Sequence, residues 1–265
     1  MPVVRANGIN INYEERGAGD PLILIMGLGA NGPVWEAHVK EYERHFRCIL
    51  MDNRGVGLSD KPAGPYTTEM MADDTAGLMQ ALGIRKARVA GISMGGAIAQ
   101  KLAVKYPERV QSALIISSWA KCDPFAVRVF EHFKKMRATS TPAEFMELLQ
   151  IWIFAAKFTA EHLDDLKKGL EDARLNPAPQ PQYAFEAQAD ACISHDSTRE
   201  LGKIQCPCQI IVGRDDIFTP LKFSEYLHKH IAKSEIDIYD MCGHAVHWEN
   251  LERFNRSSAD FLLKH

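Results

Sequence analysis

The chain has 265 residues, of which 46% are hydrophobic and 25% are charged, with 34 acidic against 31 basic side chains. This composition is typical of a globular protein and excludes collagen-like, coiled-coil and disordered chains, and the slight acidic excess offers no basic surface for nucleic acid or an anionic membrane. No apolar run approaches the roughly 20 residues that a membrane-spanning helix needs.

Strands and helices are predicted to alternate along most of the chain. The N-terminal segment alternates between apolar and polar residues, and Asn7-Gly8 predicts a hairpin turn within it. Later apolar runs do not alternate, which indicates strands buried on both faces of a parallel sheet, at 22–26, 48–51, 87–90, 113–116, 209–212 and 236–239. Helical spacing lies between them, at 69–82, 97–103 and 251–262. This order predicts an α/β fold, a mostly parallel twisted sheet with helices on both faces.

Residues 119–194 interrupt the alternation. They contain no convincing strand, and a Pro-rich segment at 176–181 breaks helical patterns such as those at 125–136 and 143–158. We therefore predict a helical lid, or cap, of residues 119–194 inserted between two sheet strands. The core domain would then comprise residues 1–118 and 195–265. The alternative is a helical subdomain that only enlarges the core.

A glycine loop, Gly27-Leu28-Gly29-Ala30-Asn31-Gly32, follows the first of the buried strands. With Asp52 at the end of the next strand, it matches the fingerprint in which glycines approach a dinucleotide pyrophosphate and an acid binds the ribose. Pro33 directly after the last glycine weakens this interpretation, as does the hairpin upstream. A nicotinamide-binding protein is nevertheless one functional alternative.

A second motif, Gly91-Ile92-Ser93-Met94-Gly95-Gly96, leaves a predicted strand and enters a predicted helix. A sharp strand-to-helix turn exposes a serine hydroxyl, and it requires almost no side chain two positions before and after that serine. Gly91 and Gly95 meet this requirement. The motif therefore predicts that Ser93 is a catalytic nucleophile, and the structural alternative is a serine that only caps a helix.

A nucleophilic serine needs a base, and the base needs an acid that orients it. His244 and the pair Asp215-Asp216 each follow a predicted strand. Because the carboxyl ends of parallel strands meet at one edge of a sheet, these side chains can converge on Ser93. Their order along the chain is also the one expected of this architecture. The residues thus predict a triad of Ser93, His244 and one of the two aspartates.

Acyl transfer also needs backbone N–H groups aimed at the developing oxyanion. One is expected from Met94, directly after the nucleophile, and the other from Leu28 in the glycine loop. The triad hypothesis therefore explains the glycine loop as well as Ser93, and it is preferred to nucleotide binding.

With these motifs the chain resembles the α/β-hydrolase superfamily over essentially its whole length. The similar segments are 26–29, 52–59, 91–96, 213–216 and 243–244. The acid of this family usually lies three residues after the glycine, which implies Asp216 rather than Asp215. Most members have histidine where this chain has Met26, so the hydrogen bond that normally braces the oxyanion loop is not expected.

Within the superfamily the chain looks most like bacterial serine esterases, enol-lactonases and aminoacrylate hydrolases. This resemblance implies that the protein hydrolyses a carboxylic ester or lactone of a small substrate through an acyl-enzyme intermediate. The segment 242–249 is similar to carbon–carbon bond hydrolases of ring-cleavage pathways. Such an enzyme stays an alternative, as do an amide or enamine hydrolase and a non-catalytic ligand receptor.

The expected triad needs neither a metal nor an organic cofactor. Six cysteines without a spacing framework and a start without a signal-peptide core predict a cytoplasmic protein with reduced thiols. The expected partner is a small-molecule ester or lactone, not nucleic acid or membrane, and a homodimer is compatible with the sequence. Asp52 and Arg54 are expected to brace loops, and His247 to lie on the surface or behind the site.

Overall fold

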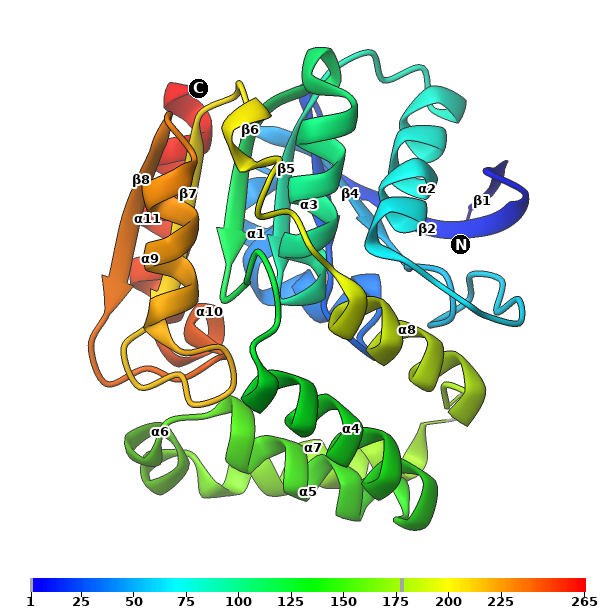
Figure 1. The fold of residues 1–265 in the computed structure, drawn as a ribbon, viewed down its shortest axis with the longest axis vertical. Helices are drawn as coiled ribbons and strands as arrows, with labels where there is room; N and C mark the ends of the chain where they lie inside the picture. Colours follow the sequence, from blue (N-terminus) through cyan, green and yellow to red (C-terminus); the bar gives the residue numbers. More distant parts are fainter. Residues whose placement is uncertain (1, 177–178) are drawn as a thin grey trace.

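The computed structural model describes residues 2–176 and 179–265. Within them, eight strands form one sheet in the order β1-β2-β4-β3-β5-β6-β7-β8 (Figure 1). β2 pairs antiparallel with β1 and β4, and the other pairs are parallel. The strands are β1 (Val3–Ala6), β2 (Ile9–Arg16), β3 (Asp20–Ile25), β4 (Phe46–Met51), β5 (Ala87–Ile92), β6 (Val110–Ile116), β7 (Cys208–Gly213) and β8 (Ser234–Tyr239). The predicted mostly parallel α/β sheet is confirmed, and the hairpin turns at Asn7 and Gly8, both with positive φ.

Helices cover both faces of the sheet, because successive side chains of each strand point to opposite faces. In β3, Ile23 and Ile25 belong to one hydrophobic cluster, which includes residues of the helices at 68–81, 94–105 and 221–230. Leu22 and Leu24 belong to another, which includes residues of the helices at 36–42 and 251–264. This two-sided burial explains why the apolar runs do not alternate. The helices of the two layers are α1 (Glu36–Tyr42), α2 (Thr68–Ala81), α3 (Met94–Lys105), α9 (Leu221–His230), α10 (Val246–Glu249) and α11 (Leu251–Lys264), with short 3₁₀ turns η1 (Gly32–Trp35), η2 (Pro107–Arg109) and η3 (Leu201–Lys203).

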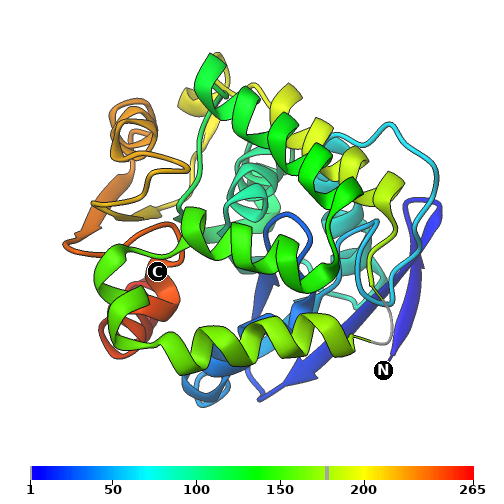
Figure 2. The same cartoon turned by 90° about the horizontal axis from the view of Figure 1, so that it is seen from below.

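The helical insert lies between β6 and β7, as predicted. It consists of α4 (Pro124–Thr139), α5 (Pro142–Ile153), α6 (Ala156–Glu161), α7 (Leu163–Leu175) and α8 (Gln182–Ser194). Figure 1 shows α4 to α7 as a layer beyond the ends of the strands, and Figure 2 views this layer face-on. The division into a core domain and a lid at residues 119–194 stays a prediction.

The helical pattern predicted at 143–158 is wrong as a continuous helix. The chain is extended at Phe154 and Ala155, which separates α5 from α6. The Ala155 N–H donates to the carboxylate of Glu249, 94 positions away, instead of to a helical carbonyl. Residues 177–178 of the Pro-rich segment 176–181 lie outside the described residues. α7 ends before this segment, and α8 begins after it.

The parallel strands all run toward the helical insert, so the loops after β3, β5, β6, β7 and β8 gather beneath it (Figure 1). This is the edge at which α/β sheets carry their functional residues. Across the described residues, no helix is long and apolar enough to cross a membrane.

Candidate active site

Ser93 lies in the turn between β5 and α3. Its backbone has φ 55° and ψ −117°, a conformation that residues other than glycine rarely adopt. A Cβ atom at Gly91 would lie 2.2 Å from the carbonyl oxygen of Gly95, and one at Gly95 would lie 2.2 Å from that of Ile25. Strand and helix are therefore so close that both positions require glycine, as the motif predicted.

Asp216 and His244 lie side by side in the loops that follow β7 and β8. Nδ1 of His244 is 2.9 Å from Oδ2 of Asp216, and the two residues are only 5% and 3% exposed. The other carboxylate oxygen accepts from the backbone N–H groups of Phe218 and Thr219 at 2.9 and 2.7 Å. Because an ionised carboxylate can only accept, this contact favours His244 donating from Nδ1, and in a neutral imidazole that places the lone pair on Nε2. Asp215, the alternative acid, is exposed.

Thr219 and Ser117 complete this arrangement, and sequence reasoning missed both. The Thr219 hydroxyl lies 2.7 Å from Oδ2 of Asp216 and 2.9 Å from Nδ1 of His244. The Ser117 hydroxyl donates to the backbone carbonyl of His244 at 2.8 Å. A threonine three residues after an aspartate is a local signal for side-chain-to-backbone bonding that could have identified Thr219. Ser117 offers no such signal, because its partner is 127 positions away.

The end of β6 also anchors the serine turn. The Ser93 N–H donates to the carbonyl of Ile116 at 2.8 Å, and the Ser118 hydroxyl donates to the carbonyl of Ser93 at 2.9 Å. Within residues 2–176 and 179–265, however, the Ser93 hydroxyl makes no hydrogen bond. The structure thus joins Asp216 to His244 directly and attaches Ser93 and His244 to one strand end. Contacts between a nucleophile and its base are often long before substrate binds.

The glycine loop after β3 packs against the nucleophile. A Cβ atom at Gly27 would lie 3.2 Å from Cβ and 3.7 Å from Oγ of Ser93. Neither the Leu28 nor the Met94 amide donates a hydrogen bond within the described part of the chain. Met94 is the first residue of α3, where helical N–H groups lack intrahelical partners. Both predicted oxyanion donors therefore lie on segments next to Ser93 with their N–H groups unused.

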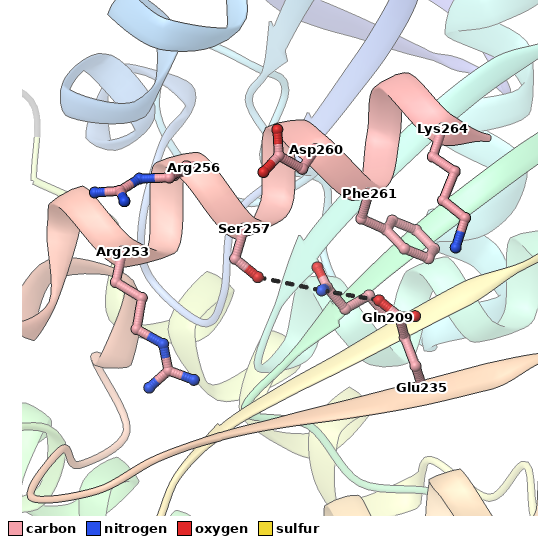
Figure 3. Close-up of a pocket in the computed structure, with 8 residues that line it drawn as sticks. All are labelled: Gln209, Glu235, Arg253, Arg256, Ser257, Asp260, Phe261 and Lys264. Atoms are coloured by element: carbon pink, nitrogen blue, oxygen red, sulfur yellow. Dashed lines mark hydrogen bonds between the residues drawn. The ribbon is translucent and has the colours of Figure 1, made fainter.

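A surface groove elsewhere in the molecule carries no comparable chemistry. It lies between α11 and strands β7 and β8, where Gln209 donates to Glu235 and Ser257 (Figure 3). The residues that line it bring together no nucleophile, histidine and acid. The strand-end loops thus remain the candidate active site.

The geometry can now be set beside known proteins. A family model described as the alpha/beta hydrolase fold matches residues 20–251. The chain belongs to the α/β-hydrolase family. A carbamate hydrolase, RutD, of Azorhizobium caulinodans is 28% identical over 261 residues and covers 98% of both chains.

Two further similar proteins have different descriptions. A 2-hydroxy-6-oxo-6-phenylhexa-2,4-dienoate hydrolase of Comamonas testosteroni is 30% identical over 261 residues, covering 95% of this chain and 91% of that one. The structure of a thermophilic esterase from Thermogutta terrifontis matches 100% of this chain and 99% of the other, with a TM-score of 0.88 and 27% identity. The fold and the hydrolase family are therefore shared across different substrates.

In this α/β hydrolase, side chains other than the expected histidine brace the glycine loop that follows β3. The Asn53 side-chain amide donates to the carbonyl of Met26 at 2.9 Å. The Gly29 N–H donates to Oε1 of Gln188 at 3.0 Å, and Nε2 of Gln188 donates to the carbonyl of Arg54 at 2.7 Å. Gln188 is fully buried in α8. A residue of the helical insert thus holds the loop that carries Leu28.

Asp52 and Arg54 brace loops of this hydrolase, as expected. The Asp52 carboxylate accepts from the N–H groups of Gly32 and Leu58, both at 2.8 Å. Arg54 donates to both carboxylate oxygens of Asp74 at 2.5 and 2.6 Å. Because both oxygens of Asp52 are bound within the protein, the contacts do not favour ribose binding by this residue.

Glu249 links the loop of His244 to the break between α5 and α6. One carboxylate oxygen accepts from the Gly243 N–H at 2.8 Å, and the other accepts from the Ala155 N–H at 3.1 Å. Next to them, the Ala245 N–H donates to the carbonyl of Ile153 at 2.8 Å. The helical insert and the histidine loop are therefore connected through the Glu249 carboxylate and through this backbone hydrogen bond.

Burial raises the pKa of Glu249 from 4.5 to about 7, and nearby Asp216 raises it further, against the opposing effects of two backbone hydrogen bonds and His244. The folded protein then binds this proton more tightly than the unfolded chain does. Its stabilising contribution is complete below pH about 4.5 and is lost as the pH rises through 7. As the pH rises from about 4.5 to above 7, we predict that the free energy of unfolding of the wild type falls relative to that of Glu249→Gln by on the order of 1–3 kcal/mol.

Urea denaturation of both proteins across this pH range measures the difference. The Glu252→Gln variant, which changes an exposed carboxyl on α11, is the matched control and should follow the wild-type curve. Parallel pH curves for wild type and Glu249→Gln would contradict the prediction.

His247 is not a surface residue, so that part of its prediction is wrong. Its side chain is 5% exposed and packs against the rings of Trp35 and His38, with centroids 6.1 and 5.2 Å apart. Burial lowers the pKa of His247 far below its ordinary range. The residue is therefore a neutral part of the core behind His244.

Proposed function

We propose that this protein is a serine hydrolase that cleaves a carboxylic ester or lactone of a small substrate through an acyl-enzyme intermediate. Ser93 is the nucleophile, His244 the general base and Asp216 the orienting acid. The hydrogen bond between Asp216 and His244, at the sheet edge that also holds the strained Ser93 turn, carries this proposal. Three residues far apart in the sequence share one edge, which a purely structural role would not require.

The first half of the proposed reaction forms the acyl-enzyme. Nε2 of His244 takes the hydroxyl proton as Oγ of Ser93 attacks the carbonyl carbon. The negative charge moves to the carbonyl oxygen, which the N–H groups of Leu28 and Met94 stabilise. His244 then gives its proton to the leaving alcohol oxygen as the carbon–oxygen bond breaks.

The second half repeats these steps with water. His244 takes a proton from water as the water oxygen attacks the acyl carbon, and it returns a proton to Oγ of Ser93 when the acid leaves. Asp216 stays ionised throughout, fixes the Nδ1–H tautomer of His244 and stabilises its charged form. Every group that moves a proton in this scheme belongs to the chain, its substrate or water.

The helical insert at 119–194 serves as a lid in this proposal. Its position beyond the strand ends and the burial of the triad support the role, since Ser93, Asp216 and His244 are 6%, 3% and 5% exposed. A lid excludes water from a reactive intermediate and shapes the acyl pocket.

A hydrolysis panel tests the proposed function. Nitrophenyl esters of increasing acyl length and several simple lactones are incubated with wild type and with Ser93→Ala as the background control. We expect saturable hydrolysis of at least one short-chain ester or lactone by the wild type alone. No turnover across the panel, or equal turnover by both proteins, would reject the proposal.

Carbon–carbon bond hydrolysis is the second candidate, because the Comamonas testosteroni relative is named a dienoate hydrolase. The same triad would then act on a 2-hydroxy-6-oxo-dienoate, whose long-wavelength absorption disappears on cleavage. The RutD relative is named a carbamate hydrolase, which extends the comparison to carbon–nitrogen bonds. If the enzyme hydrolyses the dienoate but none of the esters, this result would favour the second candidate.

Gln188→Leu should lower kcat about 10- to 100-fold with little change in KM. The variant removes the acceptor of the Gly29 N–H, so the loop that carries Leu28 loses the anchor that sets its position. Steady-state kinetics on the best ester of the panel measure this split. Gln182→Leu, elsewhere on α8, is the control and should keep kcat. An unchanged kcat in Gln188→Leu would contradict the role of this residue.

A further inference from the structure

Arg137 lies half-buried in the last turn of α4, inside the helical insert. Its Nη2 donates to the backbone carbonyl of Gln180 at 2.8 Å, and this is the only hydrogen bond its side chain makes within the described residues. No carboxylate of that part of the chain forms an ion pair with it. Among the described residues, most N–H donors of the guanidinium therefore have no protein partner.

Arg54 and Arg88 are more deeply buried than Arg137, and both form ion pairs with carboxylates. Arg54 donates to both oxygens of Asp74, and Arg88 pairs with Asp20 at 3.0 Å. Burial alone lowers the pKa of Arg137, without a charged neighbour to oppose it. Removing an unpaired charge from water is costly, and an anion brought by a ligand would offset that cost.

Two aromatic rings lie near the guanidinium. Its central carbon lies 5.6 Å from the ring centroids of both Phe145 and Phe185. The two rings pack edge-to-face with centroids 5.4 Å apart. The two rings and the Gln180 carbonyl account for part of the surroundings of the guanidinium, and its remaining donors are of the kind that bind a carboxylate through two hydrogen bonds.

Phe185 also connects Arg137 to the oxyanion loop. A Cβ atom at Gly29 would lie 3.6 Å from ring carbons of Phe185 and 3.4 Å from Oε1 of Gln180. Gly29 directly follows Leu28. In Figure 2, α4 and α8 run side by side next to the loop that follows β3. The guanidinium is thus one side chain away from the loop that the proposed reaction uses.

We propose that Arg137 binds a carboxylate on the acyl part of the substrate, at a distance from the scissile bond, so that the enzyme selects anionic esters or lactones. The inference rests on the proposed function for its catalytic consequence. The carboxylate would accept two parallel hydrogen bonds from the fork of Arg137 while the carbonyl lies at Ser93.

Matched ester pairs test the proposal. The monoethyl esters of succinate, glutarate and adipate are compared with ethyl butyrate, pentanoate and hexanoate, which have the same acyl lengths without the carboxylate. We expect the wild type to prefer the anionic ester of at least one pair by about 10- to 100-fold in kcat/KM. Arg137→Met should abolish this preference and keep turnover of the neutral esters, and Arg137→Lys should keep part of it.

Arg128→Met, which removes an exposed arginine from the same helix, controls for the change in net charge and should keep the preference. Calorimetric titration with glutarate and adipate adds a readout that needs no turnover, and Arg137→Met should lose this binding. Equal kcat/KM within every pair, or equal losses on both esters in Arg137→Met, would overturn the inference.

Absence of all ester turnover would reject the proposed function. Binding of the dicarboxylates that depends on Arg137 would then still support the anion site. Absence of that binding as well would overturn both proposals.

Discussion

Replacing Ser93 with alanine is expected to lower kcat by about 10⁴- to 10⁶-fold and to abolish covalent labelling by a fluorophosphonate. The hydroxyl is the only group that forms the acyl bond in the proposed reaction, so no neighbour can substitute for it. Discontinuous assays at high enzyme concentration measure kcat, and the intact mass of the protein after reaction measures the labelling.

Ser112→Ala is the matched control for this prediction. Ser112 is a fully buried serine of β6, outside the strand-end loops, and its loss should leave labelling intact. Retained turnover or labelling in Ser93→Ala would contradict the assignment. A loss of activity in both variants with a common loss of folding would also count against a specific role for Ser93.

Asp216→Asn has the second-largest expected effect, a decrease in kcat of about 10³- to 10⁴-fold. The Asp216 carboxylate accepts from Nδ1 of His244, from the Thr219 hydroxyl and from two backbone N–H groups. An amide has one oxygen, so its nitrogen would have to face one of these donors. His244 would then favour the tautomer that places the proton on Nε2, where it cannot act as a base.

Asp215→Asn tests the alternative that the sequence alone leaves open. Asp215 is adjacent to Asp216 but exposed, and its replacement should change kcat less than about twofold. Steady-state kinetics of the two variants on one ester make the comparison. A large decrease in kcat in Asp215→Asn, together with a normal kcat in Asp216→Asn, would reverse the assignment of the acid.

The features that the sequence predicts well are those written in local patterns. Buried strands follow from uninterrupted apolar runs, and the turn at Ser93 follows from Gly91 and Gly95, whose side-chain positions are filled by backbone. His244 and Asp216 could be placed together because both follow strands of one parallel sheet. In each case a short segment carries the whole signal.

The features that it does not predict depend on partners far along the chain. Asn12 stands at a polar position of an alternating strand, yet it is buried and donates to Asp52 across 40 positions. Gln188 accepts from Gly29 across 159 positions, and Glu249 accepts from the Ala155 N–H, 94 positions away, where α5 and α6 are separated. No local periodicity encodes such contacts, so the bracing of the site became apparent only in the folded chain.

A crystal structure of the protein after reaction with a phosphonate ester tests the central proposal most directly. We expect phosphorus bonded to Oγ of Ser93, a phosphonyl oxygen accepting from the N–H groups of Leu28 and Met94, and Nε2 of His244 within about 3 Å of Oγ. An adduct on another residue, or an imidazole turned away from Ser93, would contradict it.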